Sequence, residues 1–84
     1  MSSTNRVTYY VALPFVSTDE GLIVPEEGIE CAHAQAAMAR ARMLAATRAG
    51  AVAFSRTGDL ALGEFEPAEV LASFGQVPDD LSTL

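Results

Sequence analysis

The chain has 84 residues, half of them apolar, and a formal net charge of −6 from eleven acidic and five basic side chains. This length leaves room for one small core, so we expect a single domain over residues 1–84, with frayed ends near 1–5 and 78–84. The negative charge excludes direct binding of nucleic acid as a favoured function, because phosphate backbones are bound by Lys and Arg.

The cysteine content and the lengths of the apolar segments bear on the compartment. Cys31 is the one cysteine, so no internal disulfide can form. The longest apolar segment, 7–16, has about half the length that a membrane-spanning helix needs. Residues 1–6 at the start contain no apolar stretch of the kind that a signal peptide requires. These features predict a cytoplasmic protein with no membrane partner.

Residues 7–16, VTYYVALPFV, alternate with the period of a β-strand. We predict that one face of this strand is the core face, and that Tyr10 lies on the other. The predicted core face consists of Val7, Tyr9, Val11, Leu13 and Phe15. Turn residues at 17–21 lead to a second predicted strand at 22–24, and residues 29–31 are expected to extend it past a break.

Residues 34–49 pass without Gly or Pro and are rich in Ala, Met, Leu and Arg, which predicts a helix. Gly50 stands where a C-terminal cap belongs, and Arg48 would complement the helix dipole in the last turn. The residues that fall on one stripe, and that we expect to face the sheet, are Ala34, Ala37, Met38, Ala41, Leu44 and Ala45.

The C-terminal half begins with a predicted strand at 51–56 and a predicted turn at 57–59, TGD. Residues 67–75 fit two structures. The Pro near the start and the Gly at the end are typical of a short helix, whereas the alternation of Val70, Ala72 and Phe74 favours a strand that pairs with 51–56. We favour the strand. The expected fold is α+β, a three- or four-stranded antiparallel sheet packed by one alanine-rich helix at about 34–49.

Few residues carry chemistry. Cys31 and His33 supply half of a tetrahedral zinc site, and no third group orients them as nucleophile and base. The stretch SRTGD, 55–59, lacks the glycine spacing and the Lys of a phosphate loop, so Arg56 is interpreted as a solvated or ion-paired side chain. We therefore predict no catalytic residue, no metal site and no cofactor, and a protein that is not an enzyme.

The acidic side chains are unevenly placed. The predicted helix carries three arginines and no acid, so the rest of the chain has a balance of −9. Clustered carboxylates complement Arg and Lys and speed association with a basic protein surface, although acidic loops also serve simply to keep a small protein in solution. The predicted partner-binding residues are Glu26, Glu27, Glu30, Asp59, Glu64, Glu66 and Glu69.

Two resemblances extend these observations. The segments YYVALPF (9–15), AGAVAFSRTGD (49–59) and EVLASFGQVPDDL (69–81) resemble parts of small uncharacterised alphaproteobacterial proteins, which implies no activity. In size, acidity and lack of catalytic groups, the chain is similar in type to anti-CRISPR proteins, phage-encoded inhibitors that bind CRISPR effector complexes. That family has no common motif, so the resemblance assigns no residue.

The leading functional hypothesis is a non-enzymatic inhibitor that covers a basic nucleic-acid-binding surface of an effector, such as a CRISPR effector complex. It requires the carboxylates to lie together on the folded surface. The alternative is a small regulatory or antitoxin-like module that pairs with a partner protein or forms a homodimer, and both a monomer and a homodimer fit the sequence.

Overall fold

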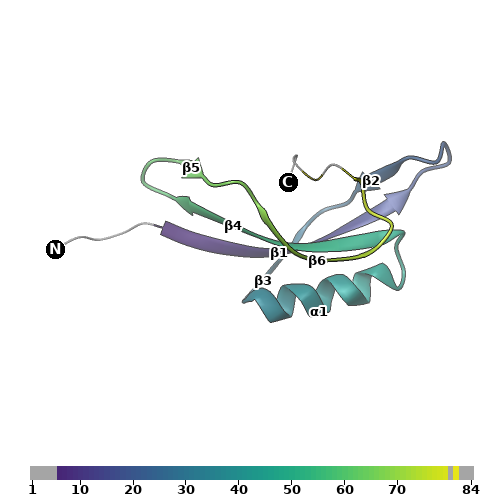
Figure 1. Cartoon of the computed structure of the whole chain (residues 1–84), viewed down its shortest axis with the longest axis horizontal. Helices are drawn as coiled ribbons and strands as arrows, with labels where there is room; N and C mark the ends of the chain where they lie inside the picture. Colours follow the sequence, from purple (N-terminus) through teal and green to yellow (C-terminus); the bar gives the residue numbers. More distant parts are fainter. Residues whose placement is uncertain (1–5, 80, 82–84) are drawn as a thin grey trace.

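A computed structural model describes residues 6–79 and 81. Within this range, a helix lies against one face of a curled antiparallel sheet (Figure 1), which confirms the predicted α+β class. The elements are β1 Arg6–Ser17, β2 Ile23–Pro25, β3 Ile29–Cys31, α1 Ala34–Ala45, β4 Gly50–Asp59, β5 Glu64–Phe65 and β6 Glu69–Gly75. The predicted frayed ends lie outside the described residues, except for 78, 79 and 81.

The long strands β1 and β4 form the centre of the sheet. They pair antiparallel from Arg6 opposite Asp59 to Phe15 opposite Gly50. The other edge of β1 is covered by β2 and β3, and the other edge of β4 is covered by β5 and β6. The N-terminal and central segments, far apart in the sequence, therefore lie side by side (Figure 1).

The prediction of three or four strands was wrong, because the described sheet has six. Both outer rows are interrupted: residues 26–28 separate β2 from β3, and residues 66–68 separate β5 from β6. On either side of the first break, Phe15 pairs with Pro25 and Ala12 pairs with Ile29. The three residues 26–28 of the outer row therefore lie opposite only two residues of β1, 13 and 14. An extra residue of this kind bends a strand and stops its ladder.

The helix starts as predicted but ends earlier. Nδ1 of His33 accepts a hydrogen bond from the Ala36 N–H at 3.1 Å and caps the first turn. After Ala45 the N–H of Thr47 bonds the carbonyl of Leu44 at 3.1 Å, a tighter turn that closes the helix. Gly50 is therefore no helix cap. It belongs to β4, where the backbone of Gln76 occupies the space that a Cβ would need.

The helix packs on the sheet through methyl groups. The fully buried residues of this interface are Ala12, Ala37, Ala41, Ala51 and Ala53. Met38, Leu44 and Ala45 pack around them, so the predicted helix stripe is confirmed at these positions and at the two buried helix alanines.

The predicted core face of β1 was wrong with respect to the helix. Tyr10, not Tyr9, packs against the alanine cluster. Alternation separates two faces of a strand but does not say which one receives the helix. The small side chains at Ala12 and Ala51 admit the close approach of an alanine-rich helix, whereas Phe15 and Val52 are buried apart from that cluster.

Two further segments differ in detail from expectation. Residues 57–59 are not a turn, since β4 runs through Asp59 and the turn is at 60–63. Residues 69–75 form a strand that pairs with β4, as we favoured over a helix. A register shift between Ala53 and Phe54 places Leu71 as an extra residue in β6.

Candidate functional site

One end of the sheet projects beyond the helix (Figure 1). At about 3.3 Å per residue the twelve residues of β1 span about 40 Å, whereas the twelve residues of α1 span about 18 Å. We call the projecting part the arm: residues 6–9 of β1, 56–59 of β4, the turn 60–63, and β5. The helix contacts β1, β3, β4 and β6 but not β5, so the arm lacks a helical layer.

The tip of the arm is a tight turn that Asp59 and Gly63 build. Oδ1 of Asp59 accepts hydrogen bonds from the N–H groups of Ala61 (2.9 Å) and Leu62 (3.3 Å). Gly63 has a φ of +68°, a conformation that glycine adopts without strain, and its N–H bonds the Asp59 carbonyl at 2.8 Å. The turn leaves Leu60 and Leu62 54% and 67% exposed.

Phe65 continues this apolar surface along the arm. Its ring lies over Gly58 in the neighbouring strand. Its centroid is 6.2 Å from that of Tyr9, in a tilted arrangement. An aromatic side chain that covers a strand glycine in this way shields an otherwise open backbone. The ring is still 41% exposed, so it covers the strand below and faces outward as well.

Cross-strand interactions hold the arm in shape. The hydroxyl oxygens of Thr8 and Thr57 are hydrogen-bonded at 2.9 Å across β1 and β4. Arg6 forms an ion pair with Glu66, which follows β5, and so connects the two strands that flank β4. The threonine pair lies within the ten-residue ladder of β1 and β4, and Arg6 stands at the end of that ladder. The arm is therefore a fixed platform for the apolar side chains at its tip.

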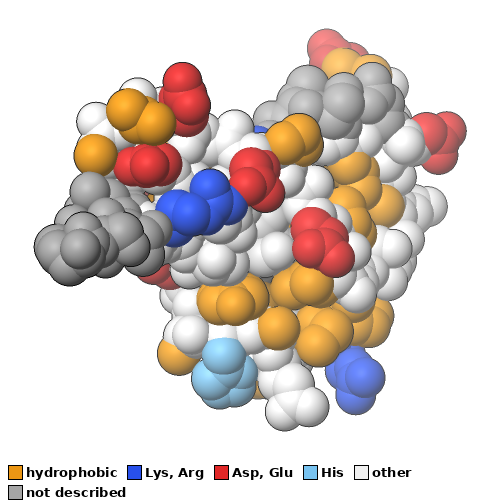
Figure 2. All heavy atoms as spheres, turned by 60° about the vertical axis from the view of Figure 1, so that its left-hand side comes forward, with side chains coloured by type: hydrophobic (Ala, Val, Ile, Leu, Met, Phe, Trp, Pro, Cys, Tyr) orange, Lys and Arg blue, Asp and Glu red, His pale blue; other side chains and the backbone are white. Residues whose placement is uncertain are grey.

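The seven predicted partner-binding carboxylates do not form one group. Glu26, Glu27 and Glu30 lie along the β1 edge of the sheet, whereas Asp59, Glu64, Glu66 and Glu69 lie along the β4 edge. Figure 2 shows the same distribution on the face that it draws, where acidic side chains are spread among hydrophobic ones.

Two of these carboxylates are engaged by arginine. Glu66 pairs with Arg6, and Oε1 of Glu26 accepts a hydrogen bond from Nε of Arg48 at 2.6 Å. The structure does bring together Asp59 and Glu64, which are opposite one another in the β4–β5 pair. This pair stands directly beside the apolar tip of the arm.

The apolar residues of the arm were not among the predicted site residues. With the turn predicted at 57–59, Leu60, Leu62 and Phe65 had no predicted role. The signal was present in the two residue types that enclose the turn. An Asp side chain, here Asp59, can accept from the backbone two residues on, and a glycine, here Gly63, supplies a positive φ.

The other residues considered for chemistry have structural contacts. Nδ1 of His33 is occupied by the helix cap, and the thiol of half-buried Cys31 donates to the Ile29 carbonyl at 3.5 Å. Over residues 6–79 and 81, no three His, Cys, Asp or Glu side chains are grouped so as to hold a metal ion. None of the described helical structure is long and apolar enough to cross a membrane.

Comparisons with protein-family models, with curated proteins and with solved structures find no match to this chain.

Proposed function

We propose that this chain works without catalysis, by binding another protein through the arm. The observation that carries the proposal is the exposure of Leu60, Leu62 and Phe65 on a projection that has no helical layer. A ribbon of two or three strands gains little stability by itself, and exposed apolar groups on it contribute most when a partner covers them. Protein interfaces commonly have such an apolar centre with a polar rim.

The proposed partner presents basic side chains around an apolar surface. Asp59 and Glu64 stand beside the tip of the arm, and the whole chain carries a net charge of −6. Carboxylates at the rim of an interface steer a basic partner into place and select against acidic ones. The exposed apolar side chains at the tip then set the shape of the contact, and the carboxylates set its charge preference.

The inhibitor hypothesis required the seven carboxylates to lie together, and the structure divides them between two edges of the sheet. We retain it only in a narrower form, as one case of binding through the arm. An effector that binds nucleic acid, such as a CRISPR effector complex, offers a basic surface of the required kind. Because the carboxylates lie on two edges of the sheet, a compact contact at the tip of the arm is favoured over a broad imitation of a nucleic-acid backbone. The net charge and the arm support this form, and a binding measurement against a purified effector tests it.

The decisive experiment compares arm variants with a matched control on the opposite hairpin. Leu62→Ser and the double variant Leu62→Ser/Glu64→Arg alter the tip. Leu22→Ser alters another exposed leucine, in the turn before β2, which is 58% exposed against 67% for Leu62. Partners from the source cell are captured on each variant and quantified, and the main partner is then purified and titrated at low and high salt.

We expect the arm variants to lose the partner and Leu22→Ser to keep it. The purified partner is expected to bind more weakly at high salt, because surface charge interactions are screened. A partner that both arm variants retain at full affinity would contradict the proposal. Circular dichroism of each variant checks that the exposed substitutions leave the fold intact.

The homodimer alternative is favoured by one observation, the outer edge of β6. All its residues except Leu71 pair with β4 on one side, and no described strand pairs with the other. The strand has no Lys and no Pro, although the extra residue at Leu71 protects the edge in part. Light scattering after size exclusion tests this: a dimer that Val70→Lys dissociates, and that Met43→Lys leaves intact, would support pairing through β6.

A further inference from the structure

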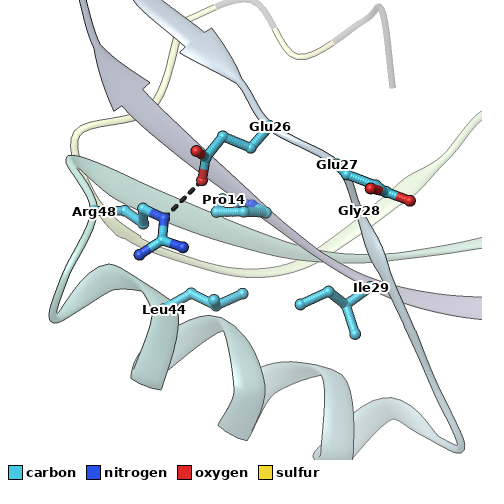
Figure 3. Close-up of a pocket in the computed structure, with 7 residues that line it drawn as sticks. All are labelled: Pro14, Glu26, Glu27, Gly28, Ile29, Leu44 and Arg48. Carbon is cyan, nitrogen blue, oxygen red and sulfur yellow. Dashed lines mark hydrogen bonds and ion pairs between the residues drawn. The ribbon is translucent and has the colours of Figure 1, made fainter.

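A pocket of about 480 Å³ lies between the interrupted edge of the sheet and the C-terminal half of α1. Figure 3 shows Pro14 as its floor on β1, with Leu44 and Ile29 on facing sides. Glu26, Glu27 and Arg48 stand at its rim. It is separate from the arm, because residues 13–14 of β1 are at the other end of the β1–β4 pair from Arg6 and Asp59.

The break between β2 and β3 creates the pocket. Three residues, 26–28, span the two positions Leu13 and Pro14 of β1, so the outer row bulges there. The chain still stays close to β1 at Gly28, where a Cβ would stand 2.9 Å from Cγ1 of Val11. The bulge therefore turns two glutamates outward above an apolar floor.

The two glutamates at the rim of the pocket differ in their contacts. Glu26 is tied to Arg48, whose Nη1 also donates to the hydroxyl oxygen of Thr47 at 2.9 Å. Glu27 has no hydrogen bond or ion pair with another described residue, and in Figure 3 it points away from Arg48. The surrounding segment, 19–30, contains five acidic residues and no basic one. An anionic ligand would meet repulsion there, and a cation would meet attraction.

We propose that this pocket receives a lysine or arginine side chain of a partner protein. Such a side chain has a long aliphatic stem and a cationic head. The stem would lie along Leu44, Ile29 and Pro14, and the head would reach Glu27 and the second carboxylate oxygen of Glu26. The inference rests on the proposed function in taking the ligand from a basic protein, and it adds a contact that the arm does not provide.

The test uses a small probe and the full chain, so it does not depend on the identity of the partner. The probe is N-acetyl-arginine methylamide, titrated while the methyl resonances of Ile29 and Leu44 are followed by NMR. Two analogues serve as controls: the norleucine compound keeps the stem without the charge, and the glutamate compound reverses the charge.

Two charge reversals locate the effect. Glu27→Arg changes the rim, and Glu20→Arg makes the same change in net charge in the turn before β2. We expect the arginine probe to shift both methyl groups, with an affinity that falls about tenfold in Glu27→Arg and less than about twofold in Glu20→Arg. The norleucine and glutamate compounds are expected to produce no saturable shift.

The inference is wrong if the arginine probe shifts neither methyl group, if both reversals weaken it equally, or if the norleucine compound binds as well. These outcomes are distinct from failure of the proposed function. The arm variants test partner binding without altering the pocket, and the probe titration tests the pocket without any partner.

Discussion

The ring of Phe65 lies so close to Gly58 that a Cβ atom at position 58 would stand 2.2 Å from its Cδ1 atom. The same Cβ atom would be 2.7 Å from the carbonyl oxygen of Glu64. The glycine is therefore required by the neighbouring strand and not by its own backbone angles. It lets the aromatic ring lie over the arm, tilted against the ring of Tyr9.

Gly58→Ala is expected to destabilise the protein by about 1–3 kcal/mol, because the ring or the strand that carries it must move. Urea unfolding measures the loss. In a Phe65→Ala background the same substitution should cost less, since part of the clash is gone. An equal cost in both backgrounds would show that the ring does not set the requirement.

Ala41→Leu is expected to destabilise by about 1–3 kcal/mol, because Ala41 is fully buried among methyl groups that leave no room for a larger side chain. Ala39→Leu is the matched control, since Ala39 is exposed on the same helix and leucine has a similar helix propensity. Thermal unfolding of the two variants should separate them clearly. Similar stability would mean that the helix can move away from the sheet at little cost.

His33→Ala is expected to cost about 1 kcal/mol, because the Ala36 N–H loses the acceptor at Nδ1 that caps the helix. His33→Asp should equal or exceed the parent in stability, since a carboxylate is a good cap and complements the helix dipole. Gln35→Ala, a change in the same turn at an exposed position, serves as control. A loss in His33→Asp as large as that in His33→Ala would contradict this account.

The ion pair of Glu26 with Arg48 joins the β2–β3 break to the segment that follows the helix. Both side chains are more than a third exposed, so the pair is expected to contribute at most about 1 kcal/mol. A double-mutant cycle with Glu26→Gln and Arg48→Met measures the coupling. The coupling should shrink in high salt, and a coupling that salt leaves unchanged would indicate a contact other than charge.

Much of the scaffold could be predicted from the sequence, since its signals are local. The alternation of residues 7–16 gave the first strand, and the alanine-rich stretch gave the helix and its buried stripe. The same signals do not identify the face that the helix covers, because both faces of β1 carry apolar residues. The size of the side chains explains which face the helix covers. The face with Ala12 lets an alanine-rich helix approach closely, whereas the face with Tyr9 carries larger side chains at Val11, Leu13 and Phe15.

The end of the helix and the length of β4 escaped prediction for a related reason. Gly50 and Gly58 look like a cap and a turn residue in the sequence, yet both are strand residues. Each is a glycine because another segment packs against it, the backbone of Gln76 in one case and Phe65 in the other. Such contacts join residues distant in the chain, and a reading of local patterns does not contain them.

The arm could not be predicted either, because the exposure of its leucines depends on where the turn lies. With the turn placed at 57–59, Leu60 and Leu62 belonged to an acidic connection and had no common surface. With β4 extended to Asp59 they share the tip. The carboxylates were found, but their division between two sheet edges depends on strand order, which composition cannot supply.

The fixed backbone of the arm has a thermodynamic consequence for the binding proposed above. A flexible loop that offered the same side chains would lose backbone entropy on association, and part of its contact energy would be spent on ordering. Here the hydrogen bonds from the N–H groups of Ala61, Leu62 and Gly63 to Asp59 already hold the backbone of the turn, so the loss falls mainly on the leucine side chains. Association should accordingly proceed with little rearrangement of this chain, and its rate should be governed by encounter and charge more than by folding.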